Sequence, residues 1–160
     1  KKPVYLRIGK ADRGNIHGNE IKGFRPGDII KVSEGSKDMP GIIATGAMVT
    51  TAIEAARRLN LNVWSAPVIK PLNKNSVVGA ALESNGIVTI EEHSNIGGLG
   101  AAVAEVLSEI YPTRLLRIGI NDRFSVNCGS YEYLLKEHGL DEATTIKEIK
   151  NFSKKSNKAR

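Results

Sequence analysis

The residues best suited to chemistry stand at the end of an apolar run that reads as a buried strand. They are Glu91, Glu92 and His93, and a glycine-rich stretch containing Gly97, Gly98 and Gly100 follows them. Carboxylates and an imidazole can serve as acid, base or metal ligand, and glycines that open a helix leave backbone N–H groups free to meet an anion. Two carboxylates are also favoured electrostatically near a helix N-terminus. Adjacent strand residues point to opposite faces, so Glu91 and Glu92 cannot both face one site without a twist. We therefore expect a ligand or interface role here and no metal site.

Other catalytic and nucleotide-binding patterns are missing from the sequence. Thr45-Gly46 lies between a strand and a helix, where α/β proteins bind ligands, but no G-x-G-x-x-G follows it and no P-loop pattern occurs. No G-x-S-x-G elbow is present, and the single cysteine, Cys128, excludes an intrachain disulfide framework and a cysteine-rich zinc site. The sequence predicts no complete catalytic set in this chain.

Hydrophobic spacing predicts the elements that must position these residues. Runs of β-formers predict strands over 3–8, 29–32, 41–44, 62–69, 87–91 and 115–120. Apolar positions at helical spacing predict helices over 48–59, 75–84, 99–110 and 131–138, and a last helix begins at the capping box Thr145–Glu148. Strands that alternate with amphipathic helices predict parallel pairing and a three-layer α/β/α sandwich. The glycine-rich stretch 10–27 is typical of an interdomain linker.

Length and charge set further bounds. A chain of 160 residues is expected to form one domain with a short appendage. The net charge of +6 comes from the two ends, where residues 1–31 hold eight Lys/Arg against three Asp/Glu and residues 141–160 hold six against three. We therefore expect no nucleic-acid partner, and a disordered basic tail over 154–160. With no apolar run of membrane-spanning length and no secretion signal, we expect a cytoplasmic protein without a membrane partner.

Several short motifs, taken in order, resemble those of transketolases. They are Pro3-Val-Tyr-Leu-Arg7-Ile-Gly, Glu34-Gly35, Ala44-Thr-Gly46, Lys70-Pro71-Leu72, Val88-Thr-Ile-Glu-Glu-His93, Gly97-Gly-Leu-Gly-Ala-Ala-Val-Ala-Glu105 and Gly119-Ile-Asn-Asp122-Arg-Phe. Asn73 departs from the family pattern, which often has Asp after Lys-Pro-Leu, yet asparagine would still cap the following helix. The resemblance covers nearly the whole chain and points to the C-terminal part of the family.

The resemblance implies a fold and a domain division. The C-terminal domain of transketolases has a mostly parallel, five-stranded mixed sheet with one antiparallel strand, which would be residues 29–32. Residues 1–27 would hold the last strand of the preceding pyrimidine-binding domain and a linker, and residues 28–153 would form the C-terminal domain. The chain resembles a fragment cut near the end of the second domain. Arg7 would then contact the phosphate of the substrate, since a guanidinium suits a bidentate grip.

The resemblance also implies an activity for the full-length enzyme. It would transfer a two-carbon ketol unit between sugar phosphates, in the pentose phosphate pathway, with thiamine diphosphate and Mg²⁺ as cofactors and as a homodimer. The fragment alone would lack the upstream domains, bind neither cofactor and be inactive. Three alternatives stay open: the C-terminal domain of 1-deoxyxylulose-5-phosphate synthase or of a 2-oxoacid dehydrogenase β subunit, a stand-alone module that binds a nucleotide or another anion, and a structural dimerisation domain without a ligand.

Overall fold

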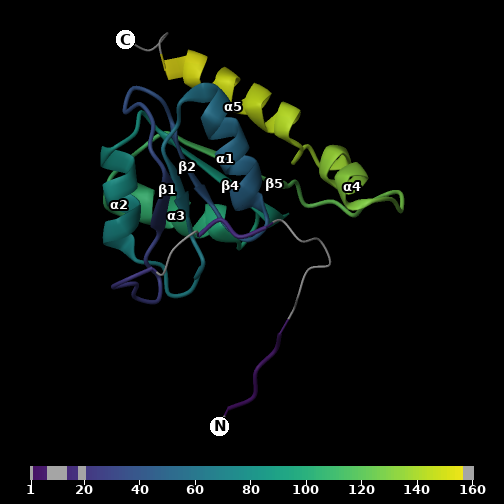
Figure 1. Cartoon of the computed structure of the whole chain (residues 1–160), viewed down its shortest axis with the longest axis horizontal. Coiled ribbons are helices and arrows are strands. Elements are labelled where there is room, and N and C mark those ends of the chain that lie inside the picture. Colours follow the sequence, from purple (N-terminus) through teal and green to yellow (C-terminus); the bar gives the residue numbers. More distant parts are fainter. Residues whose placement is uncertain (1, 7–13, 18–20, 157–160) are drawn as a thin grey trace.

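The computed structural model describes residues 2–6, 14–17 and 21–156 and arranges them as an α/β protein (Figure 1). Its elements follow in the order β1 (Ile30–Ser33), β2 (Gly41–Ala44), α1 (Met48–Leu59), β3 (Val63–Ser65), α2 (Lys74–Leu82), β4 (Ile87–Ser94), α3 (Leu99–Glu109), β5 (Leu115–Ile120), α4 (Tyr131–Glu137) and α5 (Glu142–Ser156). The predicted alternation of strands and helices is confirmed, and the bounds of α1, β2 and β5 are those expected from the sequence.

The five strands form one sheet in the order β1-β3-β2-β4-β5. β2, β3, β4 and β5 pair in parallel, and β1 pairs antiparallel with β3 at the edge. The mixed sheet with one antiparallel strand is therefore confirmed. The chain moves outward from β2 to β3 and then crosses back to β4 on the other side of β2, so the strand order reverses between β2 and β4. Right-handed crossovers then place α1 and α2 on opposite faces of the sheet.

Helices cover both faces of the sheet, which makes the three predicted layers. One apolar core joins α1 and α5 to the sheet through residues such as Ile42, Val88 and Ile149, and the other joins α2 and α3 to it through residues such as Ile43, Val77 and Leu107. Alternating residues of one strand feed the two cores, as the period of two requires. No helix among the described residues has both the length and the apolar character needed to cross a bilayer.

Several expected elements differ from the structure in presence or extent. The strand predicted over 3–8 is absent from its described part, since Pro3–Leu6 is neither helix nor strand and its apolar side chains are exposed. The strand predicted over 62–69 is present as β3 but is only three residues long. It ends early because Pro67 has no N–H group with which to continue the sheet.

The last helix, α5, begins three residues before the predicted capping box. The Asp141 carboxylate accepts a hydrogen bond from the backbone N–H of Thr144 at 3.1 Å and so takes the capping position, while Thr145 is fully buried inside the helix. α5 then continues to Ser156, three residues into the segment expected to be a disordered tail. The rest of that tail lies outside the described residues.

Asn73 caps α2, as predicted, and also ties the preceding segment to it. Its Oδ1 accepts hydrogen bonds from the backbone N–H groups of Asn75 and Ser76, and its Nδ2 donates to the Asp28 carboxylate at 2.6 Å. This hydrogen bond is the main reason that the pKa of Asp28 lies below its ordinary value. The cap therefore fixes both the start of the helix and the chain that leads into β1.

The link between Asn73 and Asp28 predicts a pH effect. A carboxyl whose pKa is lowered by folding adds stability above its unfolded pKa of about 3.9, and this stability is lost as the pH falls through the native pKa. In Asn73→Ala, the NMR titration midpoint of the Asp28 carboxyl should rise toward its ordinary value, and the stability gap to the unmodified chain should narrow at acid pH. Asn75→Ala, which leaves the Asn73 side chain in place, should not move that midpoint.

Candidate functional site

The predicted site residues lie where β4 ends, and neighbouring side chains there point to different faces. β4 extends to Ser94, three residues beyond its predicted end, and its pairing with β5 is irregular between Ile90 and Ser94. Glu91 is 1% exposed, whereas Glu92 and His93 are exposed. The expectation that Glu91 and Glu92 would not share one site is therefore confirmed. The three residues therefore do not all share one face of the sheet.

Glu91 holds the N-terminus of α3. Its Oε2 accepts a hydrogen bond from the backbone N–H of Leu99, and its Oε1 accepts one from Gly100, each at 2.7 Å. The capping position of α3 is a glycine, Gly98, with no side chain of its own to accept these bonds. A buried carboxylate thus replaces the usual cap and complements the positive end of the helix dipole. Two N–H groups that could have met an external anion are already occupied by this side chain.

The glycines around this helix start are explained by close packing. A Cβ atom on Gly98 would lie 2.0 Å from the Glu91 Oε2, and one on Gly100 would lie 2.8 Å from the Thr89 Oγ1. Gly97 has a φ of +76°, a left-handed conformation that suits glycine. The glycine run therefore lets α3 approach the buried carboxylate closely. A ligand role for Gly97, Gly98 and Gly100 stays a prediction.

Glu92 faces away from this buried contact, whereas the His93 ring lies beside it. A Cβ atom on Gly98 would be 2.9 Å from the His93 Nδ1 as well as 2.0 Å from the Glu91 Oε2. The Glu92 Oε2 accepts a hydrogen bond from the Tyr131 hydroxyl of α4 at 2.8 Å, and the His93 Nδ1 lies 2.9 Å from the backbone oxygen of Ser94. In a neutral imidazole this geometry places the proton on Nδ1, because the carbonyl oxygen can only accept. Glu92 is thus linked to the opposite helical layer from Glu91.

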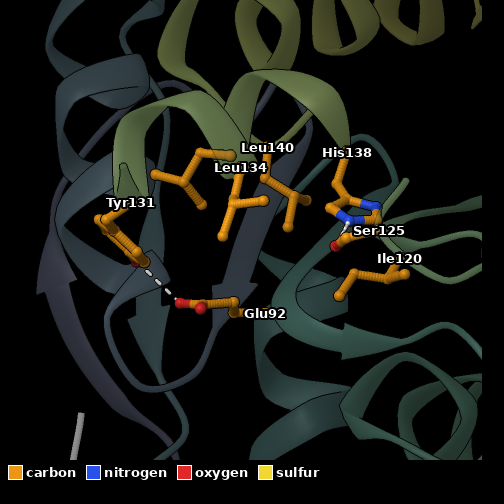
Figure 2. A pocket seen from close by; sticks show the side chains of 8 residues that line it. Glu92, Ile120, Ser125, Tyr131, Leu134, His138 and Leu140 are labelled. Atoms are coloured by element: carbon orange, nitrogen blue, oxygen red, sulfur yellow. Dashed lines mark hydrogen bonds between the residues drawn. The ribbon is translucent and has the colours of Figure 1, made fainter. Parts of the chain in front are cut away.

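A pocket of about 140 Å³ lies beside Glu92, between the ends of β4 and β5 and helix α4 (Figure 2). Leucine and isoleucine side chains form its apolar wall: Ile120, Leu134, Leu135 and Leu140. Glu92 and Tyr131 stand at one side, and Ser125 and His138 stand at the other, where the Ser125 Oγ is 2.8 Å from the His138 Nε2. Apart from Glu92, the sequence does not predict these site residues, because they come from the end of β5, the loop after it and the region of α4, 28 to 48 positions further along the chain, and form no local motif.

Two further expectations concern Arg7 and a possible metal site. Arg7 lies outside the described residues, so its contact with a substrate phosphate stays a prediction. Within the described part of the chain, no three His, Cys, Asp or Glu side chains lie close enough to hold a metal ion.

Comparison with known proteins places most of the chain in one family. Residues 31–144 match the family model described as "Transketolase, C-terminal domain". A putative transketolase C-terminal section from Methanocaldococcus jannaschii is 38% identical over 97% of this chain and 49% of its own length. One of the subunits of the apulose-4-phosphate transketolase from Phocaeicola vulgatus is 35% identical over 96% of this chain and 49% of its own length.

A third relative belongs to a different enzyme. The 1-deoxy-D-xylulose-5-phosphate synthase of Chlorobium phaeovibrioides is 37% identical over 94% of this chain, which corresponds to 24% of the synthase. The chain therefore spans about half the length of the two transketolase relatives above and about a quarter of the synthase.

The fold is also found in solved structures. A structure titled "Split gene transketolase, inactive beta4 tetramer" superposes with a TM-score of 0.76 and 34% identity, over 88% of this chain and 46% of that one. The transketolase from Leishmania mexicana superposes with a TM-score of 0.56 at 18% identity, which supports the fold alone.

Proposed function

Because the chain belongs to the transketolase family, with residues 31–144 as its C-terminal domain, we propose that it is part of a thiamine-diphosphate-dependent transketolase. The whole enzyme transfers a two-carbon ketol unit between sugar phosphates. The observation that carries this proposal is that two relatives, one named as the C-terminal section of a transketolase and the other as one of the subunits of a transketolase, match nearly the entire chain. These relatives are about twice as long, so the active enzyme needs sequence that this chain does not include.

The described residues do not fit the cofactor. The pocket of about 140 Å³ beside Glu92 accepts a molecule of the size of benzene rather than two rings and a pyrophosphate. Thiamine diphosphate, which would supply the nucleophile and the electron sink, and its Mg²⁺ are therefore assigned to the preceding domains.

We assign the chain a supporting role in that enzyme. Residues 28–153 form the C-terminal domain, and residues 1–27 would be the end of the pyrimidine-binding domain and a linker. In the described part of this N-terminal segment, Val4, Tyr5 and Leu6 are 75–89% exposed. Side chains of this kind are normally covered, which favours packing against the preceding domain. Arg7 would bind the substrate phosphate there, and the enzyme would work as a cytoplasmic homodimer.

A product assay tests this function. The chain is mixed with, or joined to, the polypeptide that carries the preceding half of a transketolase, together with thiamine diphosphate, Mg²⁺, a ketose-phosphate donor and an aldose-phosphate acceptor. We expect no turnover by the chain alone and ketol transfer by the combined protein. Arg7→Ala should raise the KM for the sugar phosphates about tenfold or more, because it removes a charge-assisted bidentate contact, and should change kcat much less. Activity of the combined protein without thiamine diphosphate would contradict the proposal.

The second candidate is the 1-deoxyxylulose-5-phosphate synthase branch, which the 37% identity to the synthase from Chlorobium phaeovibrioides favours. Pyruvate is the discriminating donor in the same assay. Product formed only when pyruvate replaces the ketose phosphate would transfer the assignment to this branch or to the 2-oxoacid dehydrogenases. Ketol transfer without pyruvate would exclude both.

A further inference from the structure

The pocket beside α4 has an apolar body of defined size. Leu135 and Leu140 are buried, Leu134 and Ile120 are half-buried, and all four line it. Its volume of about 140 Å³ is close to that of an engineered cavity of about 150 Å³ that binds benzene. A ring or a branched chain of about six heavy atoms therefore fills this space. This feature belongs to the described residues alone and does not depend on the transketolase assignment.

One side of the pocket carries a negative charge. The Glu92 Oε2 accepts a hydrogen bond from the Tyr131 hydroxyl, which fixes the carboxylate at the rim. None of the ion pairs among the described residues involves Glu92. Arg123, the arginine nearest in sequence to the lining residue Ser125, donates to the backbone oxygen of Glu137 at the opposite end of α4. A cation bound at this rim would meet a carboxylate that forms no ion pair with another described residue.

The opposite side of the pocket is polar and carries no fixed charge of its own when His138 is neutral. Ser125 and His138 are hydrogen-bonded to each other across 2.8 Å, and Figure 2 places them across the pocket from Glu92. A ligand with its charged group at Glu92 and its apolar body toward the leucines would leave this pair intact. An anion in the same place would face the Glu92 carboxylate at short range, which costs free energy.

We propose that this pocket binds a small organic ammonium ion, a primary amine attached to a ring or to a branched hydrocarbon. The ammonium group pairs with Glu92, and the hydrocarbon packs against Leu134, Leu135 and Leu140. The chain as a whole is basic, with a net charge of +6, so general electrostatic attraction would favour anions. Selective binding of a cation therefore has to come from the local charge of the pocket.

The test compares three molecules of nearly the same shape: benzylamine, benzyl alcohol and benzoate. Each is titrated into the isotope-labelled chain, and binding is followed by NMR shifts of the amides around Glu92 and in α4. Benzylamine should bind about fivefold tighter than benzyl alcohol, as expected for a single partly exposed ion pair, and benzoate should bind weakest. Equal affinities for amine and alcohol would overturn the proposal, as would the absence of any saturable shift at α4 with benzylamine.

Two variants and a matched control locate the charge and the cavity. Glu92→Gln keeps an acceptor for the Tyr131 hydroxyl but removes the charge. It should therefore lower the affinity for benzylamine about fivefold and leave the affinity for benzyl alcohol unchanged. Glu132→Gln makes the same change on an exposed residue of α4 that does not line the pocket, and it should alter neither affinity. Leu134→Phe fills the apolar space and should weaken both ligands. Unaltered benzylamine binding by Glu92→Gln, or by Leu134→Phe, would place the molecule elsewhere and refute the site.

Discussion

Glu91→Ala is expected to lower the free energy of unfolding by about 3–5 kcal/mol, because each hydrogen bond to a buried charged group contributes about 1.5–3 kcal/mol. The side chain is 1% exposed and accepts two backbone N–H groups at 2.7 Å. Alanine would leave both donors buried without an acceptor and open a cavity between β4 and α3. Urea denaturation followed by circular dichroism measures the loss.

The adjacent residue supplies the control for this experiment. Glu92→Ala makes the same substitution on an exposed side chain that accepts one hydrogen bond, and it should cost less than about 1 kcal/mol. Glu91→Gln keeps the side-chain volume but turns an amide N–H₂ toward the N–H group of Leu99 or Gly100. Its loss of unfolding free energy should therefore lie between the losses of the two alanine variants. If Glu91→Gln instead left the stability intact and abolished the activity of the combined enzyme, Glu91 would be a catalytic residue and the structural role would be wrong.

Gly35→Ala is the second substitution with a large expected effect, a loss of about 2–3 kcal/mol or more. A Cβ atom on Gly35 would lie 2.2 Å from the carbonyl carbon of Leu61 and 2.6 Å from the backbone oxygen of Asn60. Neither is a flexible side-chain end, so the chain after β1 would have to move away from the turn between α1 and β3. That movement would also break the hydrogen bond from the Gly35 N–H to the buried Asn62 Oδ1.

A glycine-to-alanine substitution at Gly79 should raise the free energy of unfolding instead of lowering it. Gly79 lies inside α2, and a Cβ atom there would meet no heavy atom within 4 Å. Gly79→Ala should stabilise the protein by about 0.5–1 kcal/mol, because alanine loses less conformational freedom in a helix than glycine does. Thermal unfolding checks both expectations: the midpoint temperature should fall for Gly35→Ala and rise for Gly79→Ala. Similar midpoints for Gly35→Ala and the unmodified chain would show that the segment after β1 is not held against the turn between α1 and β3.

The parts of the fold that rest on local patterns could be predicted from the sequence. The apolar stripe of α1 and the short apolar run of β2 set their own bounds, and Asn73 was identified as a cap because an asparagine side chain can accept from the first helical N–H groups. The start of α5 could not be predicted in this way. Asp141 and Thr145 both precede a plausible first turn, and the choice depends on the burial of Thr145 in the tertiary structure.

In the candidate site too, the features set by local sequence could be predicted and those set by tertiary contacts could not. The alternation along β4 predicted that Glu91 and Glu92 would separate, since a period of two is a local property. That Glu91 reaches the backbone of α3 could be inferred only in general terms, from the electrostatics of a helix start. The pocket needs Tyr131, Ser125 and His138 to approach β4 from across a loop, and no spacing in the sequence encodes that approach. The strand over 29–32 follows from the residues themselves, whereas its antiparallel direction follows only from the family resemblance.

The strand order also has a consequence for how the chain folds. Paired residues in neighbouring strands lie from 21 positions apart, as in Ile42 with Val63, to 46 apart, as in Ile42 with Val88. Every strand pairing in the described sheet therefore closes a loop of at least 20 residues, and none of these pairings is a hairpin that could nucleate the sheet. Proteins dominated by such distant pairings fold slowly, because the entropy of loop closure is lost before the contacts form. During synthesis β1 is complete some thirty residues before its partner β3 begins, so the first strand has no neighbour in the sheet until α1 and β3 have both been made.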